Sequence, residues 1–157
     1  MKQVIAIDPG TDQTAIVIYQ SGKILDAAIK PNDELTHELE NKYYCSSTLA
    51  IEMVACYVMP VGREVFETCV WIGRFTQAYG ASKVEYVYRR DVKLHLCNSA
   101  RAKDANIRQA LLDKFPGTGG GKTPQVGTKK QPGPLFGIKS HLWAALSVAV
   151  YFNEVKQ

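Results

Sequence analysis

The order of its strand-like and helix-like segments constrains the fold of this chain more than any other feature. Short runs rich in β-branched residues alternate with stretches whose apolar residues recur at helical spacing. The predicted strands are residues 4–7, 14–19, 23–29, 48–54 and 84–88. The predicted helices are residues 32–40, 62–79, 103–115 and 140–152, the last of them apolar almost all round. The chain is therefore expected to be an α/β protein.

The connections between these segments predict how the sheet is built. The turn signals Asp8-Pro9-Gly10-Thr11 and Ser21-Gly22 join the first three strands and predict an antiparallel meander. The strand–helix units that follow would extend it into a mixed five-stranded sheet with helices on both faces. This order is the one that an RNase H-like fold requires. A length of 157 residues fits one such domain, over residues 1–157.

Residues 116–137 differ from the rest of the chain in composition. They include seven glycines and four prolines, which predict a flexible loop. No Asp or Glu occurs between Lys114 and Asn153, so much of the net charge of +4 is expected here, which mildly favours a polyanionic partner. The lysines of the loop are Lys122, Lys129 and Lys130. The loop is not a nucleotide-binding P-loop, because Pro116 stands where that motif requires glycine, and no nucleotide cofactor is predicted.

The cysteines and the apolar runs indicate the cellular compartment. The four cysteines are widely spaced and form no CxxC pair, which argues against a zinc site. We expect reduced thiols, mostly buried as small apolar side chains, in a cytoplasmic protein. They are Cys45, Cys56, Cys69 and Cys97. The first residues lack the pattern of a signal peptide, and no apolar run is long enough to span a membrane, so no membrane partner is expected.

Two carboxylates lie in apolar strands of the predicted sheet. Asp8 ends the first strand, and Glu52 lies inside the fourth. A buried carboxylate needs a cation or strong hydrogen-bond donors, and a shared Mg²⁺ would satisfy both residues. From the spacing alone a second interpretation stays open, in which Asp8 caps a turn and Glu52 faces solvent or a lysine. His141, at the start of the last helix, is by itself more often a structural residue than a metal ligand.

Four segments of the chain, in this order, are similar to segments of one known family. They are Ile5-Ala6-Ile7-Asp8-Pro9-Gly10-Thr11 with Thr14-Ala15, then Ala50-Ile51-Glu52, then Val92-Lys93 with Ala102-Lys103-Asp104 and Ile107, and finally Ala144-Ala145-Leu146-Ser147-Val148-Ala149-Val150. The family is that of the RuvC-type Holliday junction resolvases, within the RNase H-like superfamily. The short members encoded by bacteriophages and prophages are the most similar, which implies a protein of the bacterial host cytoplasm.

The resemblance implies a function and a metal site. Resolvases of this type are homodimeric, divalent-metal-dependent endonucleases that cut Holliday junctions and other branched DNA by phosphodiester hydrolysis. Asp8, Glu52 and His141 match their catalytic metal-binding positions, which take Mg²⁺ or Mn²⁺. We expect the dimer interface at the helix of residues 62–79, where Phe66 and Val70 lie off the main apolar stripe.

The resemblance also implies DNA-binding residues. Lys93 and Lys103 match lysines that approach the DNA backbone, and the loop lysines Lys122, Lys129 and Lys130 are expected to join them. Tyr57 is a looser match to an aromatic residue that helps to open the junction, and the neighbouring Met59 is considered with it. A second interpretation is that Tyr57 and Met59 pack under the following helix.

One position departs from the family pattern and keeps other functions open. Many relatives have Asp where this chain has Ala144, so a second metal ion would lack a ligand; Asp12 and Asp104 are possible substitutes. The chain is then either a resolvase that works without this ligand or an impaired, junction-binding protein. An RNA-processing nuclease of the related YqgF type is a further alternative. A sugar-kinase or actin-like ATPase is disfavoured, because such proteins need two lobes around the nucleotide.

Overall fold

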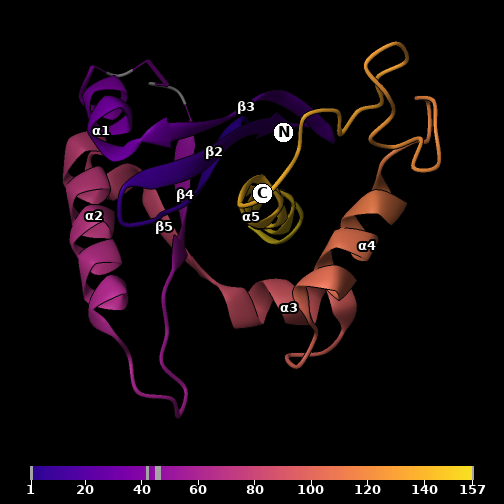
Figure 1. Cartoon of the computed structure of the whole chain (residues 1–157). Coiled ribbons are helices and arrows are strands. Elements are labelled where there is room, and N and C mark those ends of the chain that lie inside the picture. Colours follow the sequence, from indigo (N-terminus) through magenta and orange to yellow (C-terminus); the bar gives the residue numbers. More distant parts are fainter. Residues whose placement is uncertain (1, 42, 45–46, 157) are drawn as a thin grey trace.

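The computed structural model of the chain describes residues 2–41, 43–44 and 47–156, and a five-stranded sheet forms its centre (Figure 1). The strands are β1 (Val4–Asp8), β2 (Gln13–Gln20), β3 (Lys23–Pro31), β4 (Thr48–Met53) and β5 (Val84–Tyr88). Their order across the sheet is β3-β2-β1-β4-β5. β2 pairs antiparallel with β1 and β3, whereas β1, β4 and β5 run parallel to one another. The predicted mixed sheet is confirmed.

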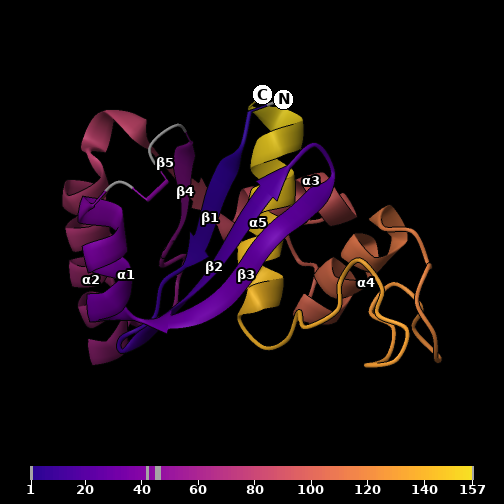
Figure 2. The ribbon, with the colours of Figure 1, turned by 90° about the horizontal axis from the view of Figure 1, so that it is seen from above.

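Helices cover both faces of this sheet, as predicted. They are α1 (Asn32–Glu40), α2 (Arg63–Tyr79), α3 (Arg89–Cys97), α4 (Asp104–Lys114) and α5 (Leu142–Val155), with a 3₁₀ turn at Ala81–Lys83. Figures 1 and 2 show α1 and α2 together on one face and α5 against the other, flanked by α3 and α4.

One helix was missed by the sequence analysis. Residues Arg89–Cys97 form α3, although no element was predicted there. The helix is mainly polar, and Val92 is its one buried residue, so it carries no apolar stripe from which a helical period could be recognised. Lys93 therefore lies on a helix, not on the expected segment between a strand and a helix.

The alternation of side chains along β1 sets up two hydrophobic cores. Successive residues of a strand point to opposite faces of the sheet. Ile5 and Ile7 lie in the core beneath α1 and α2, whereas Val4 and Ala6 lie in the core beneath α5. All four side chains are fully buried. β1 is therefore apolar up to its last residue, Asp8, which is only partly buried at the carboxyl end of the strand.

Small side chains seat α5 on the sheet. Ala6 and Ala50 on the strands and Ala145 and Ala149 on the helix are all fully buried in the same core. Without bulky side chains between them, helix and sheet pack closely. The predicted burial of the last helix is confirmed, since nine of its residues are buried. This packing fixes the beginning of α5, and with it His141, at the edge where β1 ends.

Residues 116–137 form neither helix nor strand, as their composition predicts. Backbone hydrogen bonds nevertheless join distant parts of the segment to one another. The amide of Gly120 donates to the carbonyl of Gln131, and that of Gly133 donates to Val126. Leu135 anchors the segment in the core beneath α5. Whether the loop is flexible in solution stays a prediction.

The cysteines are less buried than expected. Cys56 is exposed, and Cys69 and Cys97 are half-buried, because they lie on a loop and on partly exposed helix faces. All three are free thiols. Cys45 lies outside the described residues. Among the helices of the described part of the chain, none is long and apolar enough to cross a membrane.

Candidate active site

The carboxyl ends of three neighbouring parallel strands bring the main polar residues together. Asp8 is the last residue of β1, Glu52 lies near the end of β4, and Arg89 directly follows β5. Ala50 and Val87, two residues earlier on their strands, belong to the core beneath α5. Because side chains alternate, Glu52 and Arg89 emerge on that same face of the sheet, as Asp8 does.

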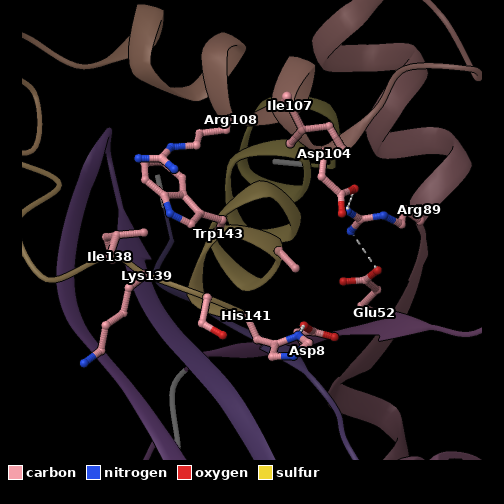
Figure 3. Close-up of a pocket in the computed structure, with 13 residues that line it drawn as sticks. Asp8, Glu52, Arg89, Asp104, Ile107, Arg108, Ile138, Lys139, His141 and Trp143 are labelled. Carbon is pink, nitrogen blue, oxygen red and sulfur yellow. Dashed lines mark hydrogen bonds and ion pairs between the residues drawn. The ribbon is translucent and has the colours of Figure 1, made fainter. Parts of the chain in front are cut away.

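His141 reaches this edge from the other end of the chain. It immediately precedes α5, and its Nδ1 lies 2.9 Å from Oδ2 of Asp8. The carboxylate is mostly buried, with 16% of the side chain exposed, whereas the imidazole is 75% exposed. Figure 3 shows the two side chains at one end of an open cleft. Asp8, Glu52 and His141 all line this cleft, whose volume is about 780 Å³. The three residues predicted to form the site are thus neighbours.

Arg89 contacts Glu52 directly and was not predicted from the sequence. Its Nη1 donates to Oε1 of Glu52 over 3.1 Å, and its Nη2 donates to Asp104. The other oxygen of Glu52, Oε2, is buried and has no hydrogen-bond partner among the described residues. Its position directly after a predicted strand could have indicated that Arg89 lies at the same end of the sheet as Glu52. Without a predicted helix at this position, there was no basis for expecting its side chain to face the cleft.

The site disfavours the negative charges that it contains. Burial and the nearby charge of Asp8 together raise the pKa of Glu52 to about 7, against the opposing effect of Arg89. Burial also raises the pKa of Asp8, although the hydrogen bond and charge of His141 oppose this. In contrast, the hydrogen bond from Arg89 lowers the pKa of Asp104. Two buried carboxylates with raised pKa values form a site that a further positive charge would stabilise.

The donor atoms fit a hard divalent cation, but they do not enclose one as they stand. Carboxylate oxygens with one imidazole suit Mg²⁺ or Mn²⁺, and the unpartnered Oε2 of Glu52 is available to a cation. Within the described residues, however, no three acidic, histidine or cysteine side chains are clustered as a metal-binding group. Arg89 holds Glu52, so a cation would compete with the guanidinium for this carboxylate.

The two suggested substitutes for the ligand missing at Ala144 lie in different places. Ala144 lines the cleft, as expected, and contributes no donor atom there. Asp104 lines the same cleft but is held by Arg89. Asp12 lies on the turn after β1 and lines an adjoining hollow that shares Asp8, Ser140 and His141 with the cleft. Of the two, only Asp104 lines the cleft itself.

The predicted DNA-binding lysines differ in their distance from the cleft, and only one of them lines a hollow beside it. Lys93 lines a hollow that adjoins the cleft and shares Asp8, Glu52 and Arg89 with it. Lys103 is exposed at the beginning of α4, and the loop lysines Lys122, Lys129 and Lys130 are exposed; these four do not line the cleft. The cleft contains instead Lys139, Arg108 and Trp143, which the sequence analysis did not single out.

Tyr57 and Met59 are exposed and do not pack under α2. Their exposed fractions are 58% and 76%, so the packing interpretation is wrong. Tyr57 lines the hollow that contains Lys93. The segment is exposed because it forms the loop between β4 and α2, beyond the edge of the sheet.

Comparison with known proteins identifies the fold. No family model matches the chain, and no curated protein matches it. Solved structures do match, among them RuvC of Thermus thermophilus in complex with a Holliday junction substrate. That match has a TM-score of 0.66 at 17% identity and covers 98% of this chain and 93% of the other. The chain has the fold of the RuvC resolvases.

A second structure of T. thermophilus RuvC agrees with this result. It matches with a TM-score of 0.66 at 15% identity over 98% of this chain and 96% of that one. The predicted RNase H-like architecture is thereby confirmed, and the RuvC-type fold extends over nearly the whole chain. The cleft with Asp8, Glu52 and His141 lies at the carboxyl end of its parallel strands, where ligands bind in open α/β sheets.

Proposed function

We propose that this chain is a divalent-metal-dependent endonuclease that cuts Holliday junctions and other branched DNA. The observation that carries the proposal is the meeting of Asp8, Glu52 and His141 in one cleft of a RuvC-type fold. Fold alone does not determine function, so the argument depends on this site. The residues that would hold the metal ion are these three, and Mg²⁺ and Mn²⁺ are the ions that suit them.

The residues of the chain have separate tasks in this proposal. When bound, the divalent ion supplies positive charge to the phosphate that is hydrolysed. The side chains of Asp8 and Glu52 are mostly buried, so water would screen their attraction to the bound ion only weakly. Arg89 donates a hydrogen bond to Glu52 and adds a positive charge to the site, so a metal ion would compete with it for this carboxylate.

The DNA is proposed to cross the cleft between two groups of cations. Lys139 lines the cleft with the carboxylates, and Lys93 lines the adjoining hollow that shares them. Each would contact backbone phosphates without reading sequence, so binding should weaken steeply with salt. Exposed lysines further out are proposed to extend this path: Lys103, Lys122, Lys129 and Lys130. Tyr57, exposed beside Lys93, is proposed to unstack bases at the junction.

Assembly as a homodimer is part of the proposal. Phe66 and Val70 on α2 are 63% and 56% exposed, on the sheet face opposite α5. Such neighbouring apolar side chains on a helix suit a symmetric contact with a second copy. Two copies related by a two-fold axis would present two sites to the two strands that must be cut in a four-way junction.

A second candidate is a junction-binding protein that does not cut. Two observations favour it: Ala144 supplies no ligand, and Arg89 already holds Glu52. An RNA-processing nuclease of the YqgF type would use the same kind of fold on a different substrate. The three functions differ in what is bound and what is cut, so one set of assays separates them.

The test compares cleavage of a four-way DNA junction, a linear duplex and a structured RNA, each with Mg²⁺ or Mn²⁺. We expect selective cleavage of the junction. Asp8→Asn should lower the rate by about a hundredfold or more while junction binding persists, because it removes charge but little volume. Asp33→Asn, on the far side of the sheet in α1, is the matched control and should cut normally. Binding without cleavage by the unaltered protein would favour the second candidate, and selective RNA cleavage would favour the third.

A further inference from the structure

The cleft contains a stacked pair of side chains that the proposed chemistry does not use. Cζ of Arg108, on α4, lies 4.7 Å from the centroid of the Trp143 ring, on the first turn of α5. Figure 3 shows this pair across the cleft from Glu52 and Arg89. The same cleft that holds the carboxylates is therefore lined by a large aromatic ring with an arginine laid over it.

The guanidinium of Arg108 is not neutralised. Within the described residues Arg108 makes no ion pair, and it is exposed. Trp143 is half-buried and packs against the core beneath α5, so the indole is fixed and supports the arginine from one side. A guanidinium that lies over an indole still has N–H groups and a face that a ligand can contact.

The position of the pair relates it to the phosphate that would be cleaved. Trp143 lies on the first turn of α5, directly after His141 and Leu142, and both Trp143 and Arg108 line the cleft that contains Asp8 and His141. A nucleotide held at the Trp143–Arg108 pair would therefore share this cleft with the phosphate at Asp8 and His141. Lys139 lines the same end of the cleft and suits the intervening phosphate.

We infer that Trp143 and Arg108 form a subsite for an unpaired DNA base, which stacks on the guanidinium in the same cleft as the cleaved phosphate. This inference rests on the proposed function and names how the site distinguishes branched from linear DNA. In a duplex each base is paired and stacked in the helix, so it is not free to occupy the subsite. At a strand crossover a base can leave its neighbours and stack on the side chains.

The competing explanation is that Arg108 contacts a phosphate only. The two differ in what they require of the side chain. A phosphate contact needs a positive charge, which lysine also supplies, whereas stacking needs the planar guanidinium, which lysine lacks. Arg108→Lys therefore separates the two explanations. Arg108 is exposed, so this substitution should leave the fold intact, which circular dichroism would check.

The first experiment measures binding by fluorescence anisotropy, with a labelled four-way junction and a duplex of equal length, in EDTA. Arg108→Lys and Arg108→Ala should both weaken junction binding about tenfold, with duplex binding changed less than about twofold for the lysine variant. Arg101→Ala, an exposed arginine just before α4 that does not line the cleft, is the charge control; any loss it causes should be equal for junction and duplex.

The second experiment identifies the base. Single abasic sites are placed in turn along the strands at the crossover. At one position, the missing base should weaken binding of the unaltered protein about tenfold and have little effect on Arg108→Lys. Such non-additivity shows that the base and the guanidinium interact.

The third experiment observes Trp143 directly. The chain has two tryptophans, and Trp71 lies on α2 with Arg74 over its ring at 4.6 Å, so it has a similar local environment away from the cleft. In Trp71→Phe, saturation with the junction should change the emission of Trp143. In Trp143→Phe, the emission of Trp71 should stay constant.

Normal junction binding by Arg108→Lys, or unchanged Trp143 emission at saturation, would overturn the subsite while leaving the proposed function standing. Failure of the unaltered protein to bind the junction at all would overturn both.

Discussion

Nδ1 of His141 lies 2.9 Å from Oδ2 of Asp8, although 133 positions separate the two residues in sequence. The contact joins the first strand to the last helix, and the alanines between α5 and the sheet hold it in place. It brings an exposed imidazole to a mostly buried carboxylate at the edge where the parallel strands end. If this pair binds the metal ion, its loss should be measurable without any cleavage assay.

His141→Ala is expected to weaken Mn²⁺ binding about tenfold to a hundredfold in calorimetry, because one of three donor groups is lost. The side chain is 75% exposed, so the melting temperature without metal should change little. His37→Ala, on α1 across the sheet, is the control and should bind Mn²⁺ normally. Unaltered Mn²⁺ affinity in His141→Ala would remove His141 from the proposed ligand set.

Glu52 should make the metal-free protein less stable at high pH. Its pKa is about 7 in the folded chain, above its ordinary value of 4.5. Between these two values the folded state holds the proton more tightly than the unfolded state, so this contribution to stability is present below pH 4.5 and is lost as the pH rises through 7. The difference corresponds to at most about 3 kcal/mol.

Glu52→Gln removes this titration while it keeps the shape of the side chain. We expect its melting temperature, relative to the unaltered protein, to rise by several degrees more at pH 8 than at pH 5. Added Mn²⁺ should stabilise the unaltered protein at pH 8 and reduce the difference. If the melting temperatures of the two proteins differed by the same amount at pH 5 and pH 8, this would contradict the raised pKa of Glu52.

Arg89 is expected to compete with the metal ion for Glu52. Arg89→Gln removes the positive charge that Oε1 of Glu52 contacts at 3.1 Å, so Mn²⁺ affinity should increase severalfold. The metal-free variant should at the same time melt at a lower temperature, because Asp8 and Glu52 lose a neutralising neighbour. Arg90→Gln, one residue further and exposed, is the matched control. Lower Mn²⁺ affinity in Arg89→Gln would mean that Arg89 positions Glu52 for the metal ion and does not oppose it.

Ala144→Asp tests the departure from the resolvase pattern. Ala144 lines the cleft with Asp8 and His141 on the first turn of α5, three residues after His141, and a carboxylate there would face the same site. We expect the variant to bind more Mn²⁺ ions per chain in calorimetry than the unaltered protein. Ala144→Asn, which adds similar volume without the charge, should not. Equal stoichiometry in the three proteins would show that this position does not limit metal binding.

The carboxylates of the site were predictable from sequence because each ends or interrupts an apolar strand. Asp8 follows four buried residues, and Glu52 follows three. Such positions put a charged group at the carboxyl edge of a buried strand. His141 was found through the resemblance alone, since its place beside Asp8 depends on the packing of α5 over the whole sheet.

Arg89, Arg108 and Trp143 were not predictable in the same way. α3 and α4 carry the two arginines and have few buried residues, so their apolar pattern says little about which side chains turn toward the cleft. The Trp143–Arg108 contact also joins elements separated by the long segment 116–137. Contacts of this kind depend on how the helices pack on the sheet, which local sequence patterns do not predict.

The exposed apolar side chains of α2 should mediate self-association. Phe66→Glu places a charge where Phe66 is 63% exposed, so folding should be preserved while a symmetric contact is weakened. In sedimentation at micromolar concentration we expect the unaltered protein to be a dimer and Phe66→Glu to shift toward the monomer. Phe136→Glu, in the segment 116–137 and 50% exposed, is the matched control and should remain dimeric. A monomeric unaltered protein would contradict the proposed dimer, and a dimeric Phe66→Glu would place the interface elsewhere.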